Sequence, residues 1–577
     1  MQQVDLTTLI AVVTELAEDW LPAKLEQVYQ RDRYTLSLGL RTLQNRGWLT
    51  LAWHPQAARL CLDQAPPRQP DTFTFSDQLR HQLHGLALVE ISLVQPWERV
   101  VDLAFAQRPG SDPLFHLYLE IMGKYSNLIL TTGDRQIITC GHQVSAQQSR
   151  VRTIQTGAAY VLPPPPPGDR PNPQEDFPSW QQRIALIPRP IGTGLLKTYQ
   201  GLSPHLVAEI LQQTGVDPDT EISTLTPNQW RALWQTWQQW LGMLTHRQFQ
   251  PAQTAEAYTV MGWGAIAPSP DTSTLLREYY AASLGQQQFQ ALHQQLQQKV
   301  NSHISKLQQK NQELKQRLSK ADKADILRHQ GDLLMAHLHL WQPGMTKITL
   351  EDFTSGHPIC IPLQPDKNAI QNAQFFYKQH QKLKRTSSAV LPLLAKLDEE
   401  ASYLEQVASQ LIQMENCPED FDALQEIRHE LIQQGYLTSH ENRQDPPQTQ
   451  FHRYTSPSGY EILIGRNNRQ NDLLSFRLAS DYDLWLHAQE TPGSHVLLRL
   501  PPGASLENPD LQSAADLSAY YSRARQSDRV PVVYTKPKYL YKPKGAKPGM
   551  VIYKHEKVIW GHPQAVRCNQ NQSSSIS

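Results

Sequence analysis

The sequence predicts a multidomain α+β protein that carries a long antiparallel coiled coil in its second half. At 577 residues the chain is long enough for about three or four domains. Residues 1–160 mix helical and strand periodicities, and a coiled-coil pattern of apolar residues occupies the middle of the chain. Pro-rich and polar stretches between these patterns mark the domain boundaries.

The charges of the chain balance, with 54 lysines and arginines against 54 aspartates and glutamates. This balance argues against a single uniformly basic nucleic-acid-binding domain and against an acidic disordered chain, but it leaves room for segregated charge. The N-terminus has no basic segment before an apolar one, and no stretch of about 18 apolar residues occurs. We therefore expect neither a signal peptide nor a membrane span.

The cysteines lie far apart and form no CxxC pair, which argues against a zinc site and against a disulfide framework. A reducing cytoplasm is the simplest setting for them. They are Cys61, Cys140, Cys360, Cys417 and Cys568.

An α+β domain is expected over residues 1–175. Apolar residues recur at helical spacing behind the potential N-cap Asp5, and residues 86–94 and 128–132 have the composition of strands. The five consecutive prolines at 163–167 cannot donate ladder hydrogen bonds and favour an extended connection. The boundary of the domain is therefore expected close behind them.

A helical domain is expected over residues 176–270, a segment rich in tryptophan. The sequence Gly-Leu-Ser-Pro at 201–204 separates two helical stretches and is typical of a short helical hairpin.

Residues 275–435 carry the clearest periodicity, because apolar residues step by three or four positions along two arms. Between the arms, residues 326–376 contain strand-like segments and are expected to form a small tip domain. Two helices of an ordinary bundle are the alternative; the Gln-rich surface at 286–298 favours the exposed coiled coil, since a bundle interior needs apolar residues on more than one seam.

The polar segment 445–450 is expected to link the coiled coil to a last α+β domain at 450–563. Residues 566–577, rich in Asn, Gln and Ser, are expected to form a disordered tail.

No catalytic residue, metal site or cofactor is predicted. The chain lacks the GxxxxGK[ST] phosphate loop, the GxGxxG turn, HExxH and GxSxG. Asp483, Ser494 and His495 do not have the spacing of a known triad, and nothing supplies an oxyanion hole. His487 and His495 likewise lack the spacing of a known metal site.

Positive charge collects in the last domain, where seven lysines between Val530 and Trp560 face one acid, Glu556, and alternate with tyrosines. Lysines neutralise phosphates and tyrosines stack on unpaired bases, so the pattern favours RNA over a protein ligand. A solvated basic face without a ligand is the alternative. The basic, amide-rich loop at 465–469 is also suited to donate to phosphates or sugars.

Short segments spaced through the whole chain match the motifs of one family. They are residues 39–42, 120–127 and 150–152 in the first domain, 372–376 and 382–384 in the middle, and 465–467, 483–487, 491–499 and 542–549 in the last domain. In sequence and order they resemble the NFACT family, in particular its bacterial RqcH branch, which is related to eukaryotic NEMF and carries the older name fibronectin-binding protein.

The resemblance implies that residues 1–175 form an NFACT-N domain whose fold is similar to the N-terminal domain of formamidopyrimidine-type DNA glycosylases. It further implies a helix-hairpin-helix domain at 176–270 and an NFACT-R RNA-binding domain at 450–563. The chain begins Met1-Gln2-Gln3 and lacks the terminal Pro-Glu of those glycosylases, so glycosylase chemistry is not expected.

The resemblance also implies a cytoplasmic ribosome quality-control factor with no membrane partner. Such proteins bind the 50S ribosomal subunit, through rRNA and a stalk-base protein, while it carries obstructed peptidyl-tRNA. They recruit tRNA, in bacteria alanyl-tRNA, and promote template-free alanine tailing that marks the stalled chain for degradation. Because ribosomal RNA carries out the peptidyl transfer, the chain is expected to be an adaptor and not an enzyme. A small RNA-binding helper protein is a further implied partner.

The family's tRNA-binding Asp-Arg pair falls on Glu98 and Arg99, a departure in which Glu keeps the charge and shifts the reach of the carboxylate. The second tRNA-contacting motif comprises Glu120, Ile121, Met122, Gly123 and Lys124. The RNA contacts expected in the last domain are Arg466, Asn467, Trp485, His487, His495, Lys536, Lys542, Lys544 and Lys547.

Two other functions stay open at this point. A fibronectin-binding adhesin would need surface exposure, for which the sequence has no signal peptide, anchor or repeats. A DNA-repair binding module would prefer damaged duplex DNA to tRNA.

Overall fold

The computed structural model describes residues 1–67, 70–149, 151–321, 324–353, 355–414, 420–438, 450–504 and 506–566. Most of the predicted linker and tail lies outside these ranges, as do Arg150, Cys417 and Cys568. The chain forms two compact units, Met1–Gly285 and Gln286–Ser577. The predicted class is confirmed, because the fold is multidomain and α+β with a long helical stretch.

An antiparallel sheet forms the centre of the first unit, with nine strands in its described residues and the order β4-β3-β2-β1-β5-β6-β7-β8-β9. Helices α1 (Leu6–Asp19) and α2 (Thr74–Leu83) pack against it. The predicted cap is confirmed, since the Asp5 side chain accepts a hydrogen bond from the backbone of Thr8. The strands are β1 (Ala23–Asp32), β2 (Thr35–Arg41), β3 (Arg46–Ala52), β4 (Arg59–Asp63), β5 (Ala87–Leu93), β6 (Val100–Ala106), β7 (Phe115–Glu120), β8 (Asn127–Thr132) and β9 (Ile137–Cys140).

The predicted strands at 86–94 and 128–132 correspond to β5 and β8 and are confirmed. The sheet consists of two meanders, β1 to β4 and β5 to β9, which are joined where β1 pairs with β5. The turn from β5 to β6 therefore lies within the second meander, and it carries residues 94–99.

The tryptophan-rich segment of the first unit is helical, as expected. Helices α3 to α6 surround a core in which Trp180, Trp230, Trp237 and Trp240 are buried. The predicted hairpin turn lies between α4 and α5, and Ser203 caps α5. The elements are α3 (Phe177–Ala185), α4 (Ile191–Thr198), α5 (Pro204–Thr214), α6 (Pro227–His246), β10 (Ala252–Gln253), β11 (Tyr258–Thr259) and β12 (Ala267–Pro268).

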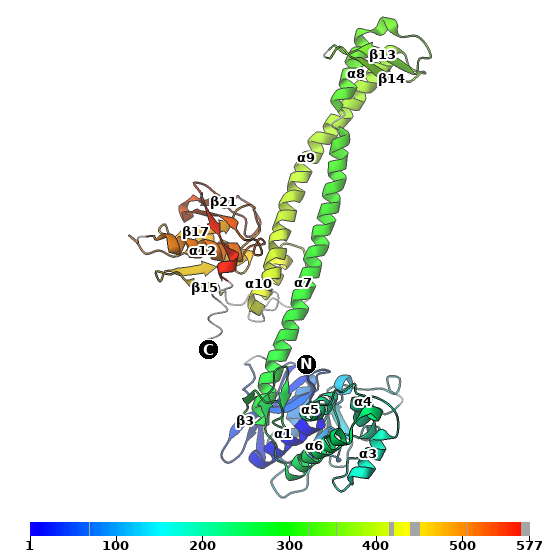
Figure 1. The fold of residues 1–577 in the computed structure, drawn as a ribbon, viewed down its shortest axis with the longest axis vertical. Helices are drawn as coiled ribbons and strands as arrows, with labels where there is room; N and C mark the ends of the chain where they lie inside the picture. The colour runs from blue at the N-terminus through cyan, green and yellow to red at the C-terminus, as the bar shows by residue number, and fades with distance from the viewer. Residues whose placement is uncertain are drawn as a thin grey trace. The chain divides into compact units, whose positions relative to one another are not determined.

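Two long helices, α7 (Thr272–Ala321) and α9 (Ala369–Gln413), lie side by side and antiparallel in the second unit (Figure 1). The part of α7 before Gln286 belongs to the first unit, where Leu275, Leu276 and Tyr280 are in the core. Leu314 packs with Val390 and Leu394 in one cluster. Phe289 and Leu411 belong to a second cluster, as the opposite chain directions require. Within the described ranges, no helix combines the length and the apolar composition that a membrane crossing requires.

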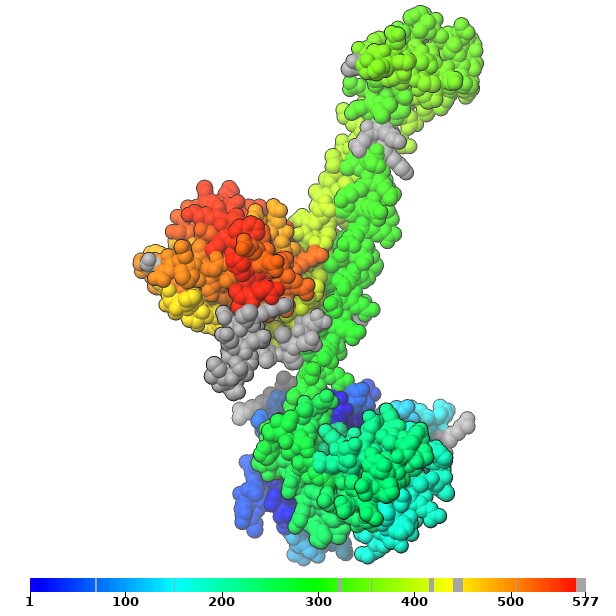
Figure 2. Space-filling model, viewed as in Figure 1, coloured from blue at the N-terminus to red at the C-terminus, as the bar shows by residue number. Residues whose placement is uncertain are grey.

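A small domain forms the widened end of this helix pair, drawn in green in Figure 2. It contains α8 (Ala324–Ala336) and the hairpin of β13 (Lys347–Glu351) and β14 (Pro358–Pro362). Its core cluster includes Leu333, Leu334, Ile361 and Ala373 of α9, all fully buried.

The C-terminal part of the second unit is a sheet with the strand order β15-β16-β18-β17-β19-β22 in its described residues. Helix α12 (Asn508–Tyr520) covers one face, while the short helix α11 (Asn468–Leu473) and a flap at residues 536–554 lie on the other face. The strands are β15 (His452–Thr455), β16 (Glu461–Ile464), β17 (Leu484–Ala488), β18 (Val496–Leu498), β19 (Val530–Thr535) and β22 (Lys557–Gly561), and the flap contains β20 (Leu540–Tyr541) and β21 (Ile552–Tyr553).

We expect Leu404→Ala to destabilise the helix pair by about 2–5 kcal/mol, because the side chain is fully buried and its truncation leaves a cavity. Hydrogen exchange of the α9 amides in the full chain measures this loss. The matched control is Leu391→Ala on the same helix, where the side chain is 52% exposed and a change within about 0.5 kcal/mol is expected. Equal destabilisation by the two variants would contradict this packing.

Candidate RNA-binding surfaces

The turn between β5 and β6 brings Glu98 and Arg99 to a cavity of about 160 Å³. Its walls come from segments that are far apart in the sequence: the start of α1, Met122 behind β7, prolines 164 and 166, and the turn before α5. The cavity therefore lies where the sheet meets the helical segment of the first unit.

Two helix N-termini meet at this cavity. Asp5 caps α1, Ser203 caps α5, and the Ser203 hydroxyl donates to Oδ2 of Asp5 at 2.8 Å. The N-terminus of a helix carries a partial positive charge, so this corner of the cavity favours negatively charged groups.

Arg99 supplies a full positive charge at the same place. Burial lowers the pKa of its guanidinium, and the carboxylates of Asp5 and Glu98 oppose this effect. Burial raises the pKa of Glu98, while Arg170 and Arg99 oppose the rise. Among the described residues, the Arg99 guanidinium makes no hydrogen bond or ion pair. A half-buried fork of unused donors is suited to a phosphate or to a base edge.

The second predicted motif is joined to the first through the backbone, because the amide of Ile121 donates to the carbonyl oxygen of Arg99 at 3.0 Å. Met122 lines the cavity, and Gly123 begins a short turn with a φ of 57°. Lys124 is exposed, and its ammonium lies 4.9 Å from the centre of the Tyr125 ring.

Glu120 and Ile121 differ from the expectation that they contact tRNA, since both side chains are buried. The Glu120 carboxylate accepts from the Tyr160 hydroxyl at 2.8 Å and from both terminal nitrogens of the Arg152 guanidinium. A buried carboxylate needs such partners. Both residues therefore support the site from inside the fold.

Three residues near this cavity were missed by the sequence reasoning as site residues. The sequence predicted Asp5 only as a helix cap, although its carboxylate also raises the pKa of the Arg99 guanidinium. Trp97 precedes the predicted pair and lines the cavity with a φ of 69°. Tyr125 is 70% exposed beside Lys124. It lies within the matched motif at 120–127, which could have identified it as a site residue from the sequence.

The predicted RNA-contacting loop of the C-terminal domain is packed against helical residues of the second unit. Asn467 is buried, caps α11 and donates to Glu426 on α10 (Phe421–Gln433) at 2.6 Å. Arg466 forms an ion pair with Asp420 at 2.7 Å. Neither residue is presented on the surface, because both hold the sheet domain to the helices.

The neighbouring Asn468 shows the same docking, since it donates to Glu430 and accepts from Gln410 of α9. Burial raises the pKa of Glu430, and hydrogen bonds from Tyr403 and Asn468 oppose the rise. The sheet domain is therefore docked through a buried polar network that joins α11 to α9 and α10.

Trp485 and His495 are also buried, at 1% and 2% exposure. The indole N–H donates to the Ser475 hydroxyl, which also lies 2.7 Å from Nδ1 of His495. Burial lowers the pKa of His487 to about 4, so this ring is neutral at physiological pH. These rings form part of the core beneath the flap, which differs from the expectation that they contact RNA.

The predicted lysines of the flap divide into two groups. Lys542 pairs with Asp472, and the ammonium of Lys547 lies 5.3 and 5.1 Å from the ring centres of Tyr403 and Tyr436. Lys536 and Lys544 are exposed and have no ion pair among the described residues. The second group is free to contact phosphates.

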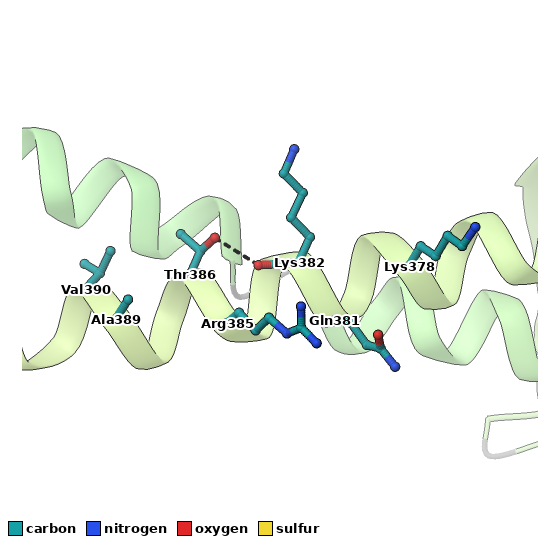
Figure 3. A pocket seen from close by; sticks show the side chains of 7 residues that line it. All are labelled: Lys378, Gln381, Lys382, Arg385, Thr386, Ala389 and Val390. Carbon is teal, nitrogen blue, oxygen red and sulfur yellow. Dashed lines mark hydrogen bonds between the residues drawn. The ribbon is translucent and has the colours of Figure 1, made fainter.

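A further basic surface, which was not predicted, lies on α9. From residue 370 to 397 the helix carries five lysines and arginines and no acid, and all five are exposed. Lys378, Lys382 and Arg385 recur at helical spacing and line a hollow of about 570 Å³ (Figure 3). We call these three residues the α9 stripe. The absence of acidic residues from this segment is visible in the sequence and could have predicted the basic surface.

Gly201→Ala is expected to displace Trp97 and to destabilise the first unit by about 1–3 kcal/mol. Gly201 has a φ of 79°, and a Cβ there would lie 2.6 Å from the Trp97 ring. The matched control is Gly215→Ala, which has a similar φ of 66° but no atom within 4 Å of the added carbon. Thermal unfolding of the full chain, followed through tryptophan fluorescence, compares the stability of the two variants. Equal destabilisation by both would show that the close approach to Trp97 does not contribute to the cost of Gly201→Ala.

Comparisons with known proteins cover the whole of this architecture. The family model for the NFACT N-terminal and middle domains matches residues 5–450, and the model for the NFACT protein RNA binding domain matches residues 450–555. The chain is 28% identical over 568 residues to a protein of Streptococcus suis named Rqc2 homolog RqcH, with 95% of this chain and 96% of the relative covered.

A second relative and a solved structure extend this comparison. The protein of Bacillus subtilis named Rqc2 homolog RqcH is 27% identical over 570 residues, with 96% of each chain covered. The structure of the C-terminal part of the fibronectin/fibrinogen-binding protein from Streptococcus suis is 30% identical, with a TM-score of 0.38, and covers 48% of this chain and 95% of that chain.

Proposed function

Because the chain belongs to the NFACT family, we propose that it is a ribosome quality-control factor that binds the 50S subunit carrying obstructed peptidyl-tRNA. It recruits tRNA, in particular alanyl-tRNA, and promotes template-free alanine tailing of the stalled chain in the cytoplasm. The ribosomal peptidyl transferase centre performs the chemistry, so the protein acts as an adaptor. A small RNA-binding protein is a further proposed partner.

The match over nearly the whole length supports this proposal and agrees with the resemblance of the motifs. The proposed parts are an NFACT-N domain at 1–175 with a glycosylase-like fold, a helix-hairpin-helix domain at 176–270, a coiled coil at 275–435 with its tip domain near the stalk base, and an NFACT-R domain at 450–563.

The observation that carries the tRNA role is the Arg99 guanidinium in its cavity, which has no hydrogen-bond or ion-pair partner in the part of the chain that the structure describes. A buried or half-buried donor without an acceptor is costly, so a ligand that brings an acceptor gains binding energy there. Glu98 keeps a negative charge close to Arg99, as the family's Asp would, and supplies an acceptor for a base amine. Met122, Gly123 and Lys124 are the proposed tRNA contacts of the second motif.

Arg99→Ala is expected to abolish alanine tailing while the protein still co-sediments with 50S subunits, because the cavity loses its charged fork and the other RNA-binding surfaces remain. Mass spectrometry of a stalled reporter measures the tails, and sucrose-gradient sedimentation measures subunit binding. The matched control is Arg108→Ala, which removes an exposed arginine outside the cavity. Unchanged tails in Arg99→Ala would contradict the assigned role, and failure of the wild-type protein to co-sediment would contradict the function.

The α9 stripe is expected to contribute to 50S binding through phosphates of rRNA. Replacing its three residues by Gln should weaken 50S binding and lower the slope of log affinity against log salt by about 2–3, because each phosphate contact contributes about 0.7–0.9 to the slope. Filter binding to 50S subunits across a salt series measures this. A variant with the charges kept, Lys378→Arg, Lys382→Arg and Arg385→Lys, should bind like the wild type. An unchanged slope in the Gln variant would exclude the stripe from the interface.

A further inference from the structure

The last strand of the C-terminal sheet presents two large apolar side chains to solvent. Trp560 is 55% exposed and Val558 is 51% exposed. Both lie on β22, which is at the edge of the sheet and pairs with β19 among the described residues. Val558 is paired with Val533, which belongs to the core cluster on the flap side. Paired residues share a face, so Val558 and Trp560 extend that face beyond its covered part.

The opposite face of β22 is covered, which holds the strand in place. Helix α12 approaches so closely that a Cβ on Gly561 would lie 2.4 Å from the carbonyl oxygen of Ala515. The amide of Gln512 donates to the carbonyl oxygen of Trp560 at 2.8 Å. The backbone that carries the Trp560 ring is therefore fixed from behind, and the ring is presented from a rigid strand.

Exposed apolar residues on an edge strand invite unwanted pairing, and proteins normally replace them with charges. Where they persist as a patch, they usually mark a binding site. The surroundings of this patch are basic, because Lys536 follows β19 directly and Lys554 precedes β22, and both are exposed. Lys557 begins β22 on the opposite face, since it is paired with Tyr534 of the cluster beneath α12. An apolar protein ligand would not need these lysines, and an acidic one would not need the tryptophan.

An unpaired RNA base with its flanking phosphates uses both features at once. Bases stack on aromatic side chains, while cations track the backbone. In duplex RNA the base faces are covered by neighbouring pairs and cannot stack on a protein ring. The combination therefore selects single-stranded RNA, such as a loop, a bulge or an end.

We propose that Val558 and Trp560 form a platform on which an unpaired RNA base stacks, while Lys536 and Lys554 hold the flanking phosphates. The proposal rests on the proposed function only in that RNA is the ligand of this domain. It goes further by naming the class of RNA and the residues that contact it.

The test uses the full chain with Arg99→Ala as the background, so that the cavity of the first unit contributes less. The probe is a single-stranded RNA of about 12 nucleotides with one central 2-aminopurine, whose fluorescence is quenched by stacking. The background protein should quench the probe. Adding Trp560→Ala should remove the quenching and weaken binding about tenfold, with an unchanged salt slope because no charge is lost. Trp560→Phe should keep most of the quenching.

Two matched variants separate stacking from charge. Lys536→Gln with Lys554→Gln should lower the salt slope by about 1.4 and keep the quenching at saturating protein. Tyr482→Ala removes another aromatic side chain of the same domain, 56% exposed, and should behave like the background. Hydrogen exchange of the β19 and β22 amides checks that the sheet is intact; should Trp560→Ala disturb it, the comparison of Trp560→Phe and Trp560→Leu carries the test.

Three results would overturn the proposal. Quenching that persists in Trp560→Ala would show that the base does not stack on this ring. If Trp560→Ala lost as much affinity for an RNA duplex of the same sequence as for the single strand, the patch would contact only the RNA backbone. Loss of 50S co-sedimentation with unchanged binding of the probe would assign the patch to a ribosomal protein. Each of these leaves the proposed function standing, since that is tested separately by co-sedimentation of the wild-type chain.

Discussion

The hydrogen bond from the Ser203 hydroxyl to the Asp5 carboxylate is the contact on which the first unit depends. The two residues are 198 positions apart, and each also caps a helix. The contact therefore places the N-termini of α1 and α5 together and puts a carboxylate beside Arg99. The indole of Trp240 supports the same joint, because it donates to the Thr7 hydroxyl at 3.0 Å. Without this joint the cavity would lose one of its walls.

A division between buried acidic side chains and exposed cationic side chains is common to the candidate surfaces. Glu120, Glu426 and Glu430 are buried and hydrogen-bonded, and each fixes a loop or strand that carries motif residues. Buried carboxylates must be paired, whereas lysines and arginines can lay their apolar stems on the protein and keep the charged end outside. These acids therefore shape the candidate surfaces from inside, and the side chains of Lys124 and Lys536 are exposed to solvent.

The neutral total charge of the chain follows from this division. Acids spread through the fold offset cations that gather on the flap and on α9, so the sum hides surfaces that are strongly basic. A balanced chain of this kind can bind RNA at chosen patches without attracting it everywhere.

Local features of the fold could be predicted from the sequence. The cap at Asp5, strands β5 and β8 and the long helices follow from side-chain type and periodicity over short distances. The contact between Asp5 and Ser203 could not be predicted, because no local pattern relates residues so far apart. The burial of Trp485 and His495 was also out of reach, since a motif states which residues occur together and not which face is covered. The α9 stripe could have been predicted, because the absence of acidic residues from 370–397 is visible in the sequence.

The cavity around Arg99 is proposed to hold tRNA while the protein is bound to the 50S subunit. The most direct measurement places a photo-crosslinking phenylalanine analogue at Tyr125, which is exposed and close to Met122 at the cavity. RNA crosslinked to the 50S-bound fraction in cells is then sequenced. The crosslinked RNA should be tRNA, with alanine tRNA enriched over its share of total tRNA. Crosslinks to no tRNA, or the same RNA when the analogue is placed at Tyr482 in the other unit, would contradict this proposal.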